Sequence, residues 1–155
     1  MGFALPAAIG AKFACPDKDV WVIAGDGGFQ MTAAELSTIV QEKLKIHIAI
    51  INNGYLGMIR QWQEFFYERN YEAAPLVSPD FVKLADAHGI PGRAVRTRAE
   101  VTPAVEEARR TPGAFLLNFM VEKEDSVYPM IPAGKALHEM IRRPGKSPIV
   151  ESADE

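Results

Sequence analysis

The sequence predicts an α/β fold, with a parallel sheet flanked by helices on both faces. Two short apolar runs, residues 20–24 and 46–51, have the composition of strands that are covered on both faces. The chain between them has helical periodicity, and units of this kind almost always form right-handed crossovers between parallel strands. A further helical pattern precedes a last apolar run at residues 114–121. This repeated alternation of strand and helix predicts the α/β class.

The composition is that of an ordinary globular protein and excludes several kinds of partner. The 155 residues are 48% hydrophobic and 24% charged, and the net charge of −3 gives no electrostatic basis for binding nucleic acid or an anionic membrane. No apolar run approaches the ~20 residues needed to cross a bilayer. The single cysteine, Cys15, cannot form an internal disulfide and fits a reducing compartment. We therefore expect a cytoplasmic protein that binds neither nucleic acid nor a membrane.

Length and pattern predict one folded domain over residues 1–143. The polar segment that follows, residues 144–155, is expected to be a disordered tail. No internal repeat and no second domain are evident in the sequence.

Local signals place the helices. Thr32 with Glu35, and Thr97 with Glu100, have the spacing of capping boxes. Pro79 is expected at the first position of another helix, where its missing N–H is tolerated. The full set of expected helices covers residues 6–13, 32–44, 58–69, 79–88, 97–108 and 136–142, with a short strand at 94–95.

Two side chains with oxygen donors follow neighbouring strands of the predicted sheet. Asp26 lies in a glycine-rich stretch after the first strand, and Asn53 lies 27 positions later, after the second. Because ligands bind in the crevice outside the carboxyl ends of parallel strands, both side chains can reach one site. A carboxylate and an amide oxygen suit a magnesium ion that carries a diphosphate. Gly27 and Gly28 would let backbone amides approach that anion.

This stretch has two other interpretations. In a lone Gly-Asp-Gly turn the aspartate commonly binds local amides, but Asn53 at the equivalent strand end favours a shared site. The P-loop pattern and the Gly-x-Gly-x-x-Gly pattern are both absent from the sequence. A nucleoside triphosphatase or a dinucleotide enzyme is therefore disfavoured.

The motif and its flanks resemble a known enzyme family. The pair of segments, Gly-Asp-Gly at 25–27 and Asn-Asn at 52–53, resembles the thiamin diphosphate-binding motif. The flanks are similar to the large catalytic subunit of acetolactate synthase (acetohydroxyacid synthase), and the resemblance runs from residue 1 to about residue 141. The segments that carry it are Gly25-Asp26-Gly27-Gly28-Phe29-Gln30-Met31-Thr32, Leu56-Gly57-Met58-Ile59-Arg60-Gln61-Trp62-Gln63 and Pro129-Met130-Ile131-Pro132.

The resemblance implies a thiamin diphosphate-binding fold and assigns roles to individual residues. Magnesium would be bound by Asp26, by the side chain of Asn53 and by the main-chain oxygen of Tyr55. Gly27 and Gly28 would hold the diphosphate, and Gly25 would belong to the same cofactor-binding site.

Further roles concern the other end of the cofactor. Met58 would contact the pyrimidine, Gly57 would allow its approach, and Met1 matches a methionine that supports the bent cofactor. Trp62 matches a tryptophan that shapes the pocket for the second 2-ketoacid. Met58 and Trp62 are spaced i, i+4, so an ordinary core pair is the alternative for both.

The implied activity is decarboxylation of pyruvate and ligation of the product to a second 2-ketoacid, in branched-chain amino-acid biosynthesis. The glutamate that activates the cofactor belongs to another domain in this family, so no catalytic residue is expected here and the fragment alone should be inactive. FAD would bind mainly outside this portion. A homodimer and a regulatory small subunit are further implied partners, beside the rest of the catalytic subunit. The alternatives are another thiamin diphosphate-dependent decarboxylase or oxidase, and a non-catalytic split subunit or remnant that acts as a binding module.

Other polar residues have ordinary structural explanations. His47 lies within a predicted strand and should be a packed or edge residue, and His88 should end a helix. Cys15 should be an inert thiol, because nothing electropositive surrounds it in the sequence. Arg60 fits a solvated side chain as well as an anion-binding one.

Overall fold

The computed structural model describes residues 1–144 of the chain, which divides into two compact units. The first unit is Met1–Glu124, and the second begins at Asp125. The tail predicted to be disordered, residues 144–155, lies outside the described residues except for Pro144. Within the described part, no helix is both long enough and apolar enough to cross a membrane.

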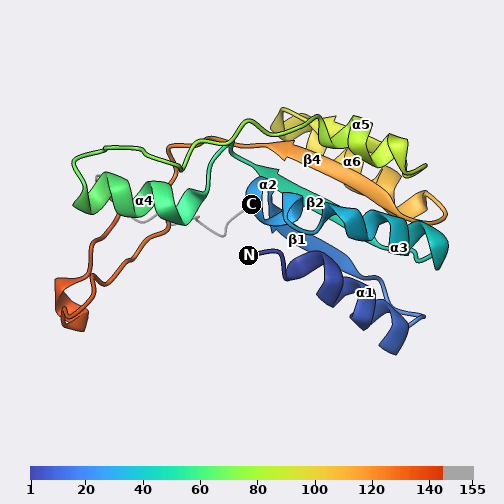
Figure 1. Ribbon diagram of the computed structural model, residues 1–155, viewed down its shortest axis with the longest axis horizontal. Helices are drawn as coiled ribbons and strands as arrows, with labels where there is room; N and C mark the ends of the chain where they lie inside the picture. The colour runs from blue at the N-terminus through green and yellow to red at the C-terminus, as the bar shows by residue number, and fades with distance from the viewer. Residues whose placement is uncertain (145–155) are drawn as a thin grey trace, which may run out of the picture. The chain divides into compact units, whose positions relative to one another are not determined.

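The first unit contains a four-stranded parallel sheet with the strand order β1-β2-β4-β3 (Figure 1). The strands are β1 Trp21–Gly25, β2 His47–Asn52, β3 Gly92–Val95 and β4 Phe115–Met120. His47 pairs with Trp21 on one side and with Phe115 on the other, so the first residues of β1, β2 and β4 lie in register. The predicted parallel sheet is confirmed, and the carboxyl ends of β1 and β2 lie side by side.

Helices cover both faces of this sheet, as predicted. Helices α1, α2, α3 and α5 contribute side chains to one buried cluster, and α6 contributes to the other. The helical elements are α1 Ala4–Ala14, α2 Asp26–Gln30, the 3₁₀ turn η1 Ala33–Glu35, α3 Leu36–Gln41, α4 Gly57–Phe66, α5 Phe81–Ala87, α6 Arg98–Arg110 and, in the second unit, the 3₁₀ turn η2 Leu137–Glu139.

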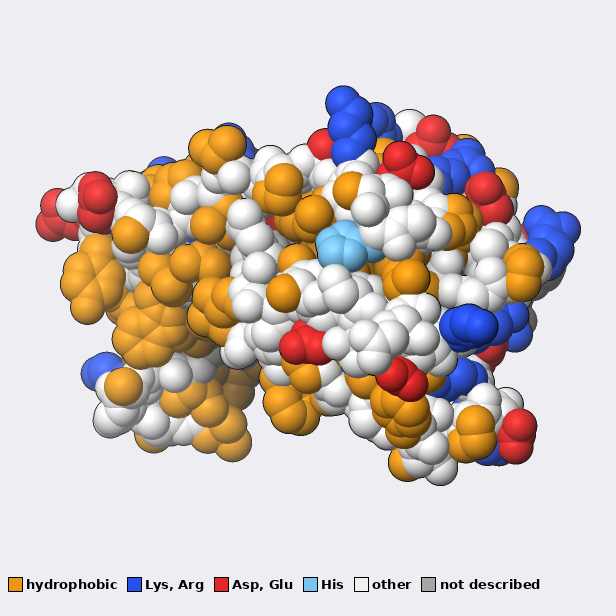
Figure 2. Space-filling view, turned by 45° about the vertical axis from the view of Figure 1, so that its right-hand side comes forward, with side chains coloured by type: hydrophobic (Ala, Val, Ile, Leu, Met, Phe, Trp, Pro, Cys, Tyr) orange, Lys and Arg blue, Asp and Glu red, His pale blue; other side chains and the backbone are white. Residues whose placement is uncertain are grey.

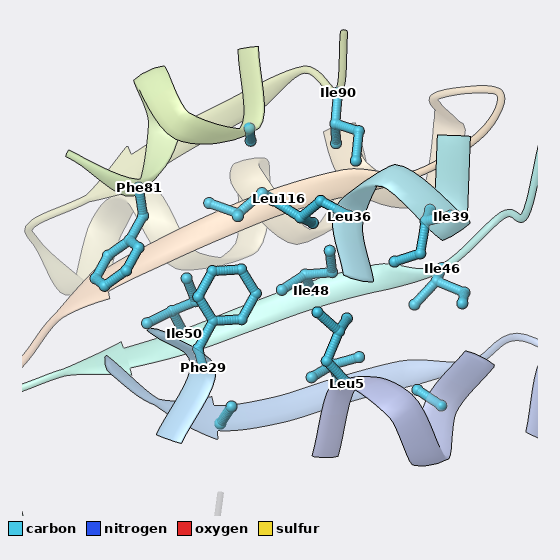
Figure 3. Packing of buried hydrophobic residues seen from close by; sticks show 14 of the residues in the cluster. Leu5, Phe29, Leu36, Ile39, Ile46, Ile48, Ile50, Phe81, Ile90 and Leu116 are labelled. Atoms are coloured by element: carbon cyan, nitrogen blue, oxygen red, sulfur yellow. The ribbon is translucent and has the colours of Figure 1, made fainter. Parts of the chain in front are cut away.

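The larger cluster fixes the elements that carry the site. Ile48 and Ile50 of β2 are fully buried in the cluster that also contains Leu5 of α1 (Figure 3). Phe29 of α2 meets Phe81 of α5 edge to face, with ring centroids 5.5 Å apart. Fully burying such a side chain stabilises the fold by ~1.5–3 kcal/mol. Helices α2 and α5 are thereby held to the same end of the sheet.

The smaller cluster covers part of the opposite face. Phe115 and Leu117 of β4 pack against Ala104 and Ala108 of α6. Ile23, which points to this face from β1, is 63% exposed. Among the described residues, α6 therefore covers the half of the face formed by β3 and β4.

One of the two predicted capping boxes is confirmed and the other is wrong. Glu100 Oε2 accepts the backbone N–H of Thr97 at 2.9 Å, as predicted for the start of α6. Thr32 instead donates its hydroxyl to Gly2 O at 3.1 Å, and Glu35 accepts from the Thr38 hydroxyl. A long-range acceptor has taken the hydroxyl that the local pattern assigned to a cap. The helical segment that follows starts as the 3₁₀ turn η1. Its α-helical part, α3, ends at Gln41 and not near residue 44.

Three other helix boundaries differ from prediction. Asp80, not Pro79, borders α5: it is the N-cap and accepts from the N–H groups of Val82 and Lys83. Helix α4 ends at Phe66, because residues 68 and 69 adopt positive φ angles of 51° and 62°. The helix expected at 136–142 is only the turn η2, since Ile141 pairs with Met130 in an antiparallel bridge.

Candidate functional site

A cavity of about 540 Å³ opens at the carboxyl ends of β1 and β2. Its lining comes from the N-terminal residues, from α2 and from the loop between β2 and α4. All nine residues predicted to bind the cofactor or metal line this cavity: Met1, Gly25, Asp26, Gly27, Gly28, Asn53, Tyr55, Gly57 and Met58. Segments separated by more than 20 residues are thus brought to one place by the β1–β2 pairing.

Asp26 is a buried carboxylate at the first position of α2. It is 1% exposed, and its Oδ2 accepts a hydrogen bond from Ser78 Oγ at 3.1 Å. Its Oδ1 is buried and accepts no hydrogen bond from any described residue. No lysine, arginine or histidine of the described chain forms an ion pair with it. Because a buried, unpaired charge is costly, this oxygen fits a cation ligand.

Asn52 and Asn53 are adjacent but have different surroundings. Asn52 is buried, donates to Asn118 Oδ1 at 3.2 Å and accepts from Gly54 N. Asn53 is half-buried and lines the cavity, and its Oδ1 accepts from Tyr55 N at 3.0 Å. An amide oxygen has two lone pairs, so this hydrogen bond leaves capacity for a second contact. Asn53 is therefore the member of the pair that can reach a ligand.

The loop that carries Asn53 is fixed by a distant segment, residues 74–78, which we call the strap. Leu56 N donates to Ala74 O, and Leu76 N donates to Gly54 O, both at 2.8 Å. No local pattern indicates the strap, because its hydrogen bonds join residues about 20 positions apart and lie outside the four strands of the sheet. The strap also carries Ser78, the partner of Asp26. The local sequence around Ser78 indicates only the start of a helix.

Two glycines at the site leave little room for a larger side chain. A Cβ on Gly27 would lie 2.6 Å from Leu56 Cδ2 and 2.8 Å from Leu76 Cδ1. A Cβ on Gly57 would lie 3.2 Å from Asn53 Nδ2. Gly27 thus leaves room for the side chains of Leu56 and Leu76, in addition to any approach of an anion. Gly57 leaves room for the Asn53 side chain.

The described residues contain no group of three or more His, Cys, Asp and Glu side chains that could hold a metal. A cation at Asp26 would depend on one carboxylate together with neutral oxygens. That donor set is hard and poor in protein charge, which suits magnesium carrying phosphate oxygens better than zinc or iron. The residues present therefore fit a magnesium diphosphate.

The structure does not bring Trp62 into the cavity lining. Trp62 lies on α4, is 40% exposed and meets Phe66 edge to face with ring centroids 5.3 Å apart. Met58, one turn earlier, does line the cavity and is 53% exposed. Neither residue is a buried core residue, and hydrophobic side chains are exposed at several places on the face of the molecule drawn in Figure 2.

Comparison with known proteins assigns this site to a family. Residues 1–119 match the family described as "Thiamine pyrophosphate enzyme, C-terminal TPP binding domain". The chain belongs to this family. Its buried Asp26 and the neighbouring Asn53 loop lie within the matched residues, so the site is part of a thiamine pyrophosphate-binding domain.

Relatives of this thiamine pyrophosphate-binding domain include acetolactate synthases. The chain is 45% identical over 141 residues to the mitochondrial acetolactate synthase of Schizosaccharomyces pombe, an alignment that covers 91% of this chain and 21% of that protein. It is 46% identical over 142 residues to the acetolactate synthase large subunit of Corynebacterium glutamicum, covering 88% and 23%. The domain thus spans between a fifth and a quarter of the length of these relatives.

A solved structure supports the fold. A thiamine diphosphate-dependent 4-hydroxybenzoylformate decarboxylase from Rhodococcus jostii RHA1 superposes with a TM-score of 0.74 and 32% sequence identity. The match covers 79% of this chain and 23% of that one. The α/β fold predicted from the sequence is therefore also the fold of a thiamine diphosphate-dependent enzyme.

Proposed function

We propose that this chain is the cofactor-binding domain of an acetolactate synthase. With the rest of the catalytic subunit it would decarboxylate pyruvate and join the product to a second 2-ketoacid. The observation that carries the proposal is the buried Asp26 carboxylate, whose Oδ1 has no partner among the described residues and which shares a cavity with Asn53. The identity to named acetolactate synthases supports this member of the family over others.

The chain's own residues would bind and orient the cofactor. Asp26 Oδ1, the Asn53 side-chain oxygen and the Tyr55 main-chain oxygen would hold magnesium. The backbone at Gly25, Gly27 and Gly28 would face the diphosphate. Other residues that line the cavity would contact the organic part of the cofactor; these are Met1, Gly57 and Met58.

The cofactor, this chain and another domain of the enzyme would each supply a different part of the chemistry. Thiamin diphosphate provides the electron sink for decarboxylation when bound. Asp26 is the single carboxylate among the described residues that line the cavity, and it would be occupied by the metal. General acid–base help, typically worth ~10²–10⁴-fold in rate, would come from another domain. We therefore propose that the chain alone binds the cofactor without turning over pyruvate.

The identity to named acetolactate synthases also supports proposals about the rest of the enzyme. Trp62, one turn of α4 beyond Met58, would contact the second 2-ketoacid. A homodimer, a regulatory small subunit and an FAD site outside this domain would complete the enzyme. We propose a cytoplasmic location, although one of the relatives is named as mitochondrial.

A second candidate is supported by the solved relative. The Rhodococcus protein is named as a decarboxylase of a 2-ketoacid, so a decarboxylase that uses the same site is the alternative within the family. Product analysis of the reconstituted subunit separates the two: acetolactate formed from pyruvate supports the first, and release of free aldehyde supports the second. A non-catalytic binding module would form neither product.

Thermal unfolding with and without thiamin diphosphate plus magnesium tests the cofactor assignment. At a hundredfold excess over Kd, binding to the native state should stabilise the chain by ~2.7 kcal/mol. Asp26→Ala should remove that stabilisation, whereas Asp86→Ala, an exposed residue of α5, should retain it. A chain whose unfolding is unchanged by the cofactor and metal would contradict the assignment.

A further inference from the structure

The two oxygens of the Asp26 carboxylate have different surroundings. Oδ2 accepts the Ser78 hydroxyl at 3.1 Å, whereas Oδ1 is buried and has no hydrogen-bond partner among the described residues. A carboxylate can rotate about its Cβ–Cγ bond, so a single strong donor on one oxygen fixes where the other oxygen points. Ser78 is the side chain that makes this distinction.

Ser78 is itself held from both sides along the chain. On its N-terminal side, Leu76 N donates to Gly54 O at 2.8 Å, which ties the strap to the loop that carries Asn53. On its C-terminal side, Asp80 caps α5, and Phe81 is fully buried against Phe29 of α2. Since α2 begins at Asp26, the donor and acceptor of this hydrogen bond are anchored to the same packed end of the sheet.

The strap therefore contacts both segments that carry the proposed metal ligands, the start of α2 and the loop after β2. Leu76 and Leu56 occupy the space beside Gly27, next to Asp26, and the strap backbone pairs with the loop after β2. Within the strap, Ser78 contacts a proposed ligand side chain directly, through its hydrogen bond to Asp26 Oδ2.

We propose that Ser78 is a positioning residue for the divalent cation: its hydroxyl holds Asp26 Oδ2 and so presents Oδ1 to the metal. This inference rests on the proposed function, in which Asp26 binds magnesium. Outer hydrogen bonds of this kind orient metal ligands, and their loss typically costs ~10–100-fold in metal affinity. Magnesium demands near-ideal octahedral geometry, whereas calcium accepts flexible coordination by more ligands. Loss of Ser78 should therefore weaken magnesium binding more than calcium binding.

The test is calorimetric titration of the chain with Mg²⁺ and, separately, with Ca²⁺ at saturating thiamin diphosphate. Ser78→Ala should weaken Mg²⁺ binding by ~10–100-fold, with a smaller loss for Ca²⁺. Ser78→Thr, which keeps the hydroxyl at a half-buried position, should restore Mg²⁺ affinity. Val77→Ala is the matched control, because Val77 is the neighbouring strap residue and its side chain is fully exposed.

The outcomes separate this inference from the proposed function. Unchanged Mg²⁺ affinity in Ser78→Ala, or equal losses for Mg²⁺ and Ca²⁺, would overturn the positioning role while leaving the metal site in place. Failure of the unsubstituted chain to bind Mg²⁺ with thiamin diphosphate would overturn the proposed function and, with it, this inference. Rescue by Ser78→Thr together with a changed preference between the two metals would support the role.

Discussion

The guanidinium carbon of Arg60 lies 5.6 Å from the ring centroid of Tyr55 and joins helix α4 to the proposed metal loop. Tyr71 contributes a second ring at 5.0 Å, and Glu64 Oε2 accepts from Arg60 Nη1 at 2.8 Å. Arg60 is only 7% exposed, so these contacts replace its hydration. Desolvated cation–π contacts are worth up to ~2 kcal/mol. Arg60, which sequence reasoning left between a solvated and an anion-binding role, is a buried structural cation.

Substitution of Arg60 tests this conclusion. Arg60→Leu should lower the free energy of unfolding by about 2–3 kcal/mol, somewhat less than the ~3–5 kcal/mol of a fully buried broken pair, because Glu64 stays 21% exposed. Urea denaturation measures the change. Arg110→Leu is the control: it breaks an i, i+4 pair with Glu106 that is exposed at both ends, and should cost under ~1 kcal/mol. Equal costs for the two substitutions would contradict the burial argument.

Gly27 provides a second prediction, which concerns the fit of the strap. In Gly27→Ala the new methyl group would overlap the ends of Leu56 and Leu76, and overpacking of this kind costs ~1–3 kcal/mol. The better helix propensity of alanine recovers up to ~1 kcal/mol, so we expect a net loss of stability of about 1–2 kcal/mol. Gly10→Ala, in α1 with open space around it, should instead stabilise the chain by ~0.5–1 kcal/mol. Chemical denaturation should show opposite signs; the same sign for both would refute the packing account.

The success of sequence reasoning at this site depended on the range of each interaction. Asp26 and Asn53 were placed correctly in one cavity because each directly follows an apolar strand, and parallel pairing then aligns the strand ends. The cap at Thr97 was also correct, since its partner Glu100 is three residues away. Thr32 was misassigned because its acceptor, Gly2 O, lies 30 residues earlier.

The hydrogen bond from Ser78 to Asp26 escaped prediction for the same physical reason. Its acceptor lies 52 positions away, and the strap that carries it has no periodicity to reveal its contacts. The short motif around it favoured a helix start, which was correct only for Asp80. Local propensity identifies caps and strands, whereas the hydrogen-bond partners of proposed ligands depend on tertiary packing.

His47 gives a prediction for the dependence of stability on pH. It is fully buried in β2, and its Nδ1 has no hydrogen-bond partner among the described residues. Burial lowers the pKa of His47 below 6.5, opposed by Asp19 at 3.4 Å and assisted by the positive charges of Lys45 and Arg109. The unfolded chain then binds more protons, so stability should fall as the pH drops from 6.5 through the folded-state pKa.

Urea denaturation at a series of pH values on both sides of 6.5 measures this effect. His47→Gln removes the titrating group and should flatten the dependence in that window, whatever its effect on absolute stability. His138→Gln, an exposed residue of the second unit, should leave the dependence unchanged. If the chain with His47→Gln loses stability on acidification as steeply as the unsubstituted chain, another group is responsible.

The adjacent residues Asn52 and Asn53 allow the structural and ligand-binding roles of the loop to be separated. Asn52→Ala would leave the buried Asn118 Oδ1 without its donor and should lower the free energy of unfolding by ~1–3 kcal/mol. It should change Mg²⁺ affinity little, because Asn52 does not line the cavity beside Asp26. Asn53→Ala removes a half-buried side chain and should cost under ~1 kcal/mol.

The same two variants should rank in the opposite order for metal binding. Asn53→Ala takes away a proposed magnesium ligand, so Mg²⁺ titration at saturating thiamin diphosphate should show the larger loss there. Each variant is the control for the other, since they differ by one position at the same strand end. If Asn52→Ala abolishes Mg²⁺ binding while Asn53→Ala leaves it intact, the assignment is reversed. Asn52, and not Asn53, would then be the magnesium ligand of this loop.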